Sequence, residues 1–158
     1  NAKEVGESGA RNLLIYPYHE TTHTEAGITW TDNGNGTITA NKINERVLPY
    51  VTAAEINYLA FGVISIDYHI ALYGDFQTQT GKSRIEAADS HLAAQTEYNA
   101  TIHEKRDSYG NSHYQTLPTY IRNAIDHPDS GRVYSDGDLE TSILLLRSIC
   151  KRIRSGTP

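Results

Sequence analysis

The sequence predicts a mainly α-helical protein, a four-helix bundle with a small β-hairpin at its N-terminal end. Before residue 45, apolar and polar residues alternate around asparagine and glycine, a pattern that is typical of paired strands. After Thr52, apolar residues recur at helical spacing, in segments separated by polar stretches. We therefore expect two domains, a hairpin extension over residues 1–45 and a helical domain over residues 46–158.

Composition places the chain among ordinary globular proteins. Of its 158 residues, 38% are hydrophobic and 21% are charged, which excludes wholesale disorder. No apolar run approaches the roughly 18 residues that span a bilayer, so we expect no membrane partner. The segment 1–10 lacks the apolar core of a signal peptide, and we expect a cytoplasmic protein. The net charge of −5 argues against a protein that coats nucleic acid, although it permits one local RNA site.

The predicted hairpin lies within residues 28–40. Residues 28–31 and 37–40 each alternate between apolar and polar, and the sequence DNGNG between them supplies turn residues. Asparagine and glycine tolerate the positive φ angles that tight hairpin turns require. Because a lone hairpin is only marginally stable in water, we expect it to pack on the rest of the chain or on another chain.

The first two predicted helices are long. The segment 52–76 is apolar on nearly all sides, which predicts a central, buried helix. After a polar linker at residues 77–82, Ser83 is expected to cap a second helix over residues 83–106. The polar segment 107–114 is expected to be a loop.

The last two predicted helices have the clearest boundaries. Pro118 suits a first helical turn, and Pro128 disfavours helical geometry at His127, so the third helix should end there. Ser135 and Asp138 have the spacing of a capping box at the start of the fourth helix. The residues of the apolar stripe that follows this cap are Leu139, Ile143, Leu146, Cys150 and Ile153.

The third helix carries the strongest candidate for a functional site. Its apolar face leaves Arg122, Asn123, Asp126 and His127 on the remaining surface. Asn123 and His127 are neighbours on a helix, as are Arg122 and Asp126, because residues four positions apart share a face. A permanently charged guanidinium beside a titratable imidazole suits phosphate chemistry. The alternative interpretation is a surface ion pair next to a polar helix end, with no function.

The sequence YIRNAIDHPD at residues 120–129 resembles the R-x(4–6)-H motif of HEPN domains, within a wider resemblance over residues 52–154. The resemblance implies a metal-independent endoribonuclease that needs no cofactor, cleaves RNA and acts as a homodimer in phage defence or a toxin system. By the same resemblance, His127 is expected to act as general acid or base and Arg122 to bind the scissile phosphate. Asn123 is expected to orient the phosphate or the histidine by hydrogen bonding.

Three further residues are expected to contribute to substrate binding: Asp126, Lys151 and Arg152. Asp129 stands where the antitoxin-paired HEPN subgroup has tyrosine, which disfavours that subgroup. Some HEPN domains serve only in dimerisation, nucleotide binding or binding of a regulatory partner, and this non-catalytic role is one alternative. The other alternative is a virion protein with virion partners, because residues 12–40 resemble a segment that opens a β-sandwich in phage tail and minor structural proteins.

Other polar motifs predict no metal site. His19, Glu20 and His23 match the H-E-x-x-H pattern of zinc hydrolases, but the surrounding residues favour a strand or a loop. Strand positions four apart are separated by ~13 Å, too far for two imidazoles to share one metal ion. Cys150 is the single cysteine, and we expect it to be a small buried residue rather than a nucleophile. His69 has no predicted partner.

Overall fold

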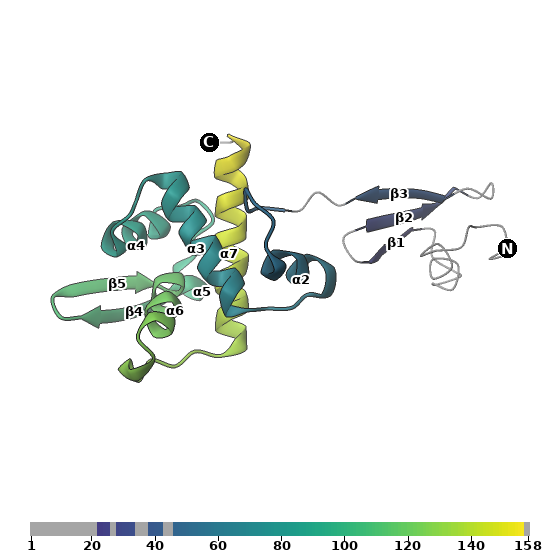
Figure 1. Ribbon diagram of the computed structural model, residues 1–158. Helices are drawn as coiled ribbons and strands as arrows, with labels where there is room; N and C mark the ends of the chain where they lie inside the picture. The colour runs from purple at the N-terminus through teal and green to yellow at the C-terminus, as the bar shows by residue number, and fades with distance from the viewer. Residues whose placement is uncertain (1–21, 26–27, 34–37, 43–45, 157–158) are drawn as a thin grey trace. The chain divides into compact units, whose positions relative to one another are not determined.

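The chain forms two structural units, Asn1–Glu45 and Arg46–Pro158, each of which is described by itself. The residues that the computed structural model describes are 22–25, 28–33, 38–42 and 46–156. Figure 1 shows β-strands in the first unit and a mainly helical second unit. No helix among the described residues is both long and apolar enough to cross a membrane.

The described part of the first unit is an antiparallel sheet with the strand order β1-β2-β3. Its strands are β1 (Thr22–Glu25), β2 (Ile28–Asp32) and β3 (Ile38–Lys42). The predicted pairing of two strands is confirmed, because Trp30 in β2 lies opposite Ala40 in β3. The structure adds β1, in which His23 lies opposite Trp30. His19, Glu20 and residues 34–36 of the predicted turn lie outside the described residues.

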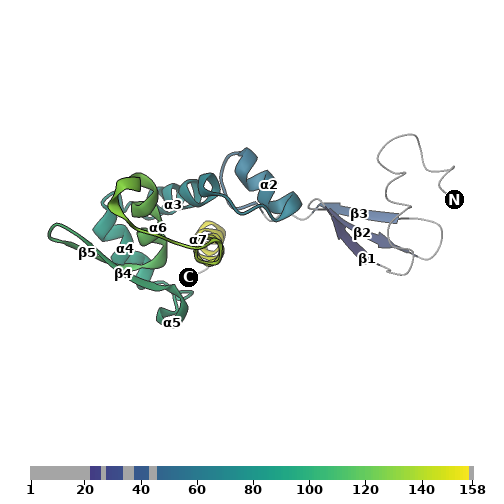
Figure 2. The same cartoon turned by 90° about the horizontal axis from the view of Figure 1, so that it is seen from below.

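The second unit confirms the prediction of a mainly helical protein. Its helices are α2 (Ala53–Phe61), α3 (Ile66–Thr80), α4 (Ile85–Ala93), α5 (Ala100–His103), α6 (Leu117–Asp126), the short 3-10 helix η2 (Pro128–Ser130) and α7 (Asp136–Ser155). Two strands, β4 (Glu104–Tyr109) and β5 (Ser112–Thr116), form an antiparallel hairpin. In both Figure 1 and Figure 2 this hairpin extends away from α7, and it packs against α4 and α6.

The core of the second unit lies between α3 and α7, which run side by side (Figure 1). The fully buried apolar side chains that these two helices contribute are Tyr68, Leu72, Phe76, Ile143, Leu146, Ile149 and Cys150. Cys150 is buried, as predicted, and burial raises the pKa of its thiol to about 12. At the C-terminal end of α7, Arg154 forms an ion pair of 2.8 Å with Asp75 of α3.

The prediction of one buried helix over residues 52–76 is wrong, because the chain divides there into α2 and α3. Gly62 ends α2 in the left-handed conformation, at φ 67°, which glycine adopts at little cost. The hydroxyl of Ser65 then accepts the backbone N–H of Tyr68 and starts α3. As a result α2 lies at the periphery, and the side chain of Phe61 is 75% exposed.

The predictions of a helix over residues 83–106 and of a loop over residues 107–114 are also wrong. Helix α4 ends at Ala93, and a single turn, α5, leads directly into the β4–β5 hairpin. Gly110 makes the hairpin turn at φ 59°. The hairpin sequence is polar, so its stability comes from pairing and from its contacts with α4 and α6, which helical periodicity does not reveal.

A buried carboxylate connects α4 to the junction between β5 and α6. Asp89 is 2% exposed, and its Oδ1 atom accepts the backbone N–H of Thr116 at 3.0 Å and the Thr116 hydroxyl at 2.6 Å. Its Oδ2 atom accepts the backbone N–H of Gln115 at 2.8 Å. Thr116 is also the N-cap of α6, where its side chain accepts the N–H of Thr119. Asp89 therefore determines where α6 begins.

A second buried carboxylate anchors the start of this unit. Glu55 of α2 is fully buried, and its Oε1 atom accepts the backbone N–H groups of Val47 at 2.6 Å and Leu48 at 3.0 Å. Arg46 pairs with the other oxygen at 3.4 Å, and the Tyr68 hydroxyl donates to Oε1 at 3.4 Å. These donors compensate for the burial of the charge.

The boundaries of the last two helices agree with prediction. Helix α6 has Pro118 in its first turn and ends at Asp126 with His127 as its C-cap. Ser135 and Asp138 form a capping box at the start of α7, where each side chain bonds to the other residue's backbone N–H.

We predict that Asp89→Asn destabilises the protein by about 2–3 kcal/mol, because an amide nitrogen would then face N–H and O–H donors in a buried site. The free energy of unfolding, measured by urea denaturation, tests this. Ser90→Ala, on the exposed face of the same helix, is the matched control. Equal effects of the two substitutions would contradict the anchoring role of Asp89.

Candidate functional site

The predicted site residues lie together at the C-terminal end of α6. Arg122, Asn123 and Asp126 belong to the last turns of this helix, and His127 caps it. The apolar face of α6 packs into the core, where Leu117, Ile121 and Ala124 are buried. This burial orients the helix, so that the Arg122, Asp126 and His127 side chains remain partly or largely exposed.

Arg122 contacts two polar side chains of its own helix. Its Nη2 atom lies 2.5 Å from Oδ2 of Asp126, and its Nη1 atom donates to Oδ1 of Asn123 at 3.1 Å. The side chain of Arg122 is 27% exposed and that of Asp126 is 39% exposed. The guanidinium is therefore accessible from solvent and already holds a carboxylate.

Asn123 is a buried partner of Arg122. The prediction that it lies on the exposed surface of the helix is wrong, because the residue is only 4% exposed. Its side-chain oxygen accepts from Arg122, and its backbone carbonyl accepts the N–H of His127 at 3.1 Å. The side chain of Asn123 thus contacts Arg122, whereas its bond to His127 is the ordinary backbone bond of a helix end.

His127 lies where the helix stops. Its backbone has φ −129° and ψ 71°, outside the helical region, as expected for a residue that precedes proline. The carbonyl of His127 accepts the N–H of Ser130, which closes the short η2 turn. The imidazole is on an exposed residue at the end of the helix.

The segment that follows His127 is held against α6 and β4 by contacts that sequence reasoning missed. Arg132 and Asp107 form an ion pair of 2.8 Å, and their side chains are only 9% and 11% exposed. The Tyr120 hydroxyl accepts the N–H of Val133 at 3.2 Å and donates to its carbonyl at 3.1 Å. Lys105 lies 4.6 Å from the centre of the Tyr120 ring. No spacing along the chain links β4 to this segment, so no sequence signal predicted these contacts.

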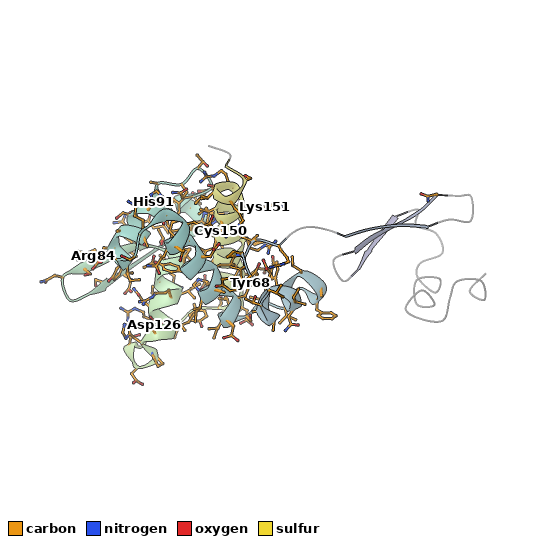
Figure 3. All side chains as sticks on the ribbon, turned by 45° about the horizontal axis from the view of Figure 1, so that its top comes forward. Tyr68, Arg84, His91, Asp126, Cys150 and Lys151 are labelled. Carbon is orange, nitrogen blue, oxygen red and sulfur yellow. The ribbon has the colours of Figure 1, made fainter. Side chains whose placement is uncertain are left out.

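The structure does not bring Lys151 and Arg152 together with the α6 cluster. Both lie near the C-terminal end of α7, and Figure 3 shows Lys151 and Asp126 at opposite ends of the second unit. Arg152 forms an ion pair of 2.6 Å with Glu97 and donates to the Gln95 side chain at 2.6 Å. Arg152 thus ties α7 to the connection between α4 and α5.

The positive charge of Arg122 also affects a buried tyrosine, Tyr73, beneath α6. The Tyr73 hydroxyl of α3 hydrogen-bonds to the Thr119 hydroxyl of α6 at 3.0 Å. Burial raises the pKa of Tyr73 to about 12, while its bond to Thr119 and the positive charge of Arg122 oppose the increase. The charge of Asp89 raises this pKa, so Asp89 and Arg122 act on the Tyr73 hydroxyl in opposite directions.

His69 has a partner that the sequence did not predict. Its Nε2 atom lies 2.9 Å from the Ser142 hydroxyl, which joins α3 to α7, and both residues are fully buried. The Nδ1 atom has no hydrogen-bond partner among the described residues. Burial lowers the pKa of His69 to about 3, so this imidazole is neutral near pH 7. It has no access to solvent, and its role is structural.

An open depression of about 550 Å³ lies between the start of α3 and the start of α7. The residues that line it include Ile64, Ile66, Asp67, Tyr134, Asp136 and Leu139. None of the α6 cluster lines this depression, and its surface is mostly apolar. The groups that can act on a phosphate therefore belong to the polar α6 cluster and not to this depression.

The fold and the cluster together define a mainly helical protein with a guanidinium and an imidazole at one helix end. Within the described ranges, no three histidine, cysteine, aspartate or glutamate side chains are grouped so that they could hold a metal ion. Comparisons with protein-family models, with curated proteins and with solved structures find no match to this chain.

We predict that Tyr120→Phe loosens the segment after His127. The substitution removes the acceptor of the Val133 N–H, and it should lower the free energy of unfolding by about 1 kcal/mol. Amide hydrogen exchange at Val133 should become faster. Tyr50→Phe, at an exposed tyrosine, controls for loss of a hydroxyl. Unchanged exchange at Val133 would show that the Tyr120 hydroxyl does not hold this segment.

We predict that His69 makes the protein less stable in acid. Its pKa is about 3 in the folded chain and 6.5 when unperturbed, so below pH 6.5 the unfolded chain binds a proton that the folded chain excludes. The free energy of unfolding should therefore fall by up to about 1.4 kcal/mol per pH unit below this point, relative to His69→Gln. Denaturant unfolding over this pH range tests the difference, with His113→Gln as the control. Parallel curves for wild type and His69→Gln would contradict it.

Proposed function

We propose that the protein is a metal-independent endoribonuclease of HEPN type, in which His127 and Arg122 act on the RNA backbone. The observation that carries the proposal is the position of Arg122 at the C-terminal end of α6, where Asn123 and Asp126 hold its partly exposed guanidinium and His127 caps the same helix. A cationic group and an imidazole therefore lie five positions apart at one helix end. The resemblance of residues 120–129 to the HEPN motif supports the same assignment.

The proposed reaction is cleavage by the neighbouring 2′-hydroxyl. The 2′ oxygen attacks phosphorus and the bond from phosphorus to the 5′ oxygen breaks, which leaves a 2′,3′-cyclic phosphate and a 5′-hydroxyl. A base takes the proton of the 2′-hydroxyl, and an acid donates a proton to the 5′ oxygen. The imidazole of His127 suits either role, because a histidine side chain can both accept and donate a proton. Arg122 binds the phosphate and stabilises its developing charge.

A second copy of the chain would complete this site. The reaction uses both an acid and a base, whereas the α6 cluster contains one histidine. Two α6 ends facing each other in a homodimer would supply two imidazoles and two guanidiniums. Mass measurement in solution tests this part of the proposal, and an active enzyme that is monomeric at its working concentration would contradict it.

We predict that the wild-type protein cleaves labelled single-stranded RNA or tRNA in the presence of EDTA and that His127→Ala slows cleavage about 10²–10⁴-fold. The products should carry 2′,3′-cyclic phosphate ends. His113→Ala, at an exposed histidine of β5, is the matched control and should cleave at the wild-type rate. Circular dichroism establishes that all three proteins are folded.

Two results would overturn the catalytic assignment. The first is cleavage at equal rates by wild type and His127→Ala, which would indicate a contaminating ribonuclease. The second is no cleavage by folded wild type. A non-catalytic module that dimerises or binds a nucleotide would then be the better account, or a virion component if the protein assembles into rings or larger particles.

A further inference from the structure

Asp126 occupies the position on Arg122 that a phosphate oxygen would take. Its Oδ2 atom lies 2.5 Å from Nη2 of Arg122, at hydrogen-bond distance. The Asp126 side chain is 39% exposed, whereas Asn123, which accepts from Nη1 of the same guanidinium, is only 4% exposed. Arg122 thus has one buried partner and one solvent-exposed partner.

The ion pair is weak for two physical reasons. Asp126 is the last residue of α6, where the helix dipole places partial negative charge and disfavours a carboxylate. Partly exposed pairs four residues apart on a helix also gain little from their attraction, because water and salt screen it. Another anion can therefore displace the Asp126 carboxylate at low cost.

A phosphodiester is well suited to this exchange. It presents paired oxygens to a guanidinium much as a carboxylate does, and Arg122 binds either group with the same N–H donors. While the exchange takes place, the Nη1 bond to the buried Asn123 keeps the guanidinium in position.

We propose that Asp126 is an internal competitor that occupies Arg122 until an RNA phosphate displaces it. This inference rests on the proposed function, and it assigns Asp126 a restraining role in place of the substrate-binding role expected from the sequence.

The test compares Asp126→Asn with Asp129→Asn. Both substitutions remove one negative charge, but Asp129 lies in η2 and makes no described contact with Arg122. Binding of inorganic phosphate is followed through the side-chain Nε–Hε signal of Arg122 by NMR. Binding of fluorescent single-stranded RNA is measured in a His127→Ala background, in which cleavage does not interfere. Thermal melts establish that each variant is folded.

The expected result is that Asp126→Asn binds phosphate and RNA about two- to fivefold more tightly than Asp129→Asn does. This gain should disappear when Arg122→Gln is added, because the competitor acts only through Arg122. Equal affinities of the two variants would overturn the proposal, since net charge alone would then explain the effect. Weaker binding by Asp126→Asn would also overturn it and would mean that Asp126 holds Arg122 in its binding position.

These binding results are independent of the cleavage assay. Absence of cleavage by wild type would remove the ribonuclease function, yet tighter phosphate binding by Asp126→Asn would still identify Asp126 as the competitor at an anion site. Conversely, the assays could show cleavage that depends on His127 together with equal binding by the two asparagine variants. This result would support the ribonuclease function and would reject the competitor role of Asp126. If wild type and both variants bind neither phosphate nor RNA, the anion site itself is rejected.

Discussion

The hydrogen bonds of one buried carboxylate determine how the candidate site is presented. Asp89 accepts the backbone N–H groups of Gln115 and Thr116, and so fixes the point at which β5 ends and α6 begins. From that point, 3.6 residues per turn determine which side chains face the core and which face solvent. A shift of the start by one residue would rotate α6 by about 100° and turn Arg122 away from its present surroundings.

How much of the fold could be predicted depends on whether its determinants are local. Pro118 indicates the first turn of α6, Pro128 indicates its end, and the capping box indicates the start of α7, because these signals act within a few residues. The β4–β5 hairpin could not be predicted in this way. Its sequence is polar, and the carboxylate that holds its end comes from Asp89, which lies 26 positions before Gln115. Gly62 is a local signal for the end of α2, but the apolar composition of residues 52–76 led to the prediction of one continuous helix.

In the candidate site too, the features that depend on local spacing could be predicted and those that depend on tertiary structure could not. Helical spacing alone predicts that Arg122 and Asp126 are neighbours, and the structure shows the ion pair. Spacing also places Asn123 one turn before His127, but only the packing of α6 shows that its amide is buried. The separation of Lys151 from this cluster is a property of tertiary structure, because it depends on the direction of α7 relative to α6. Long-range contacts, such as those of Tyr120 with Val133, likewise have no signature in residue spacing.

The hydrogen bonds from Val47 and Leu48 to Glu55 determine how far the helical unit can be shortened at its N-terminal end. A fragment that begins at Arg46 retains the N–H groups of Val47 and Leu48, which the buried carboxylate needs. A fragment that begins after Leu48 would keep α2 to α7 and would bury the Glu55 carboxylate without these two donors, at a cost of several kcal/mol. Val47 and Leu48, which precede α2, therefore belong to the core of this unit, and fusion partners or tags have to be joined upstream of them.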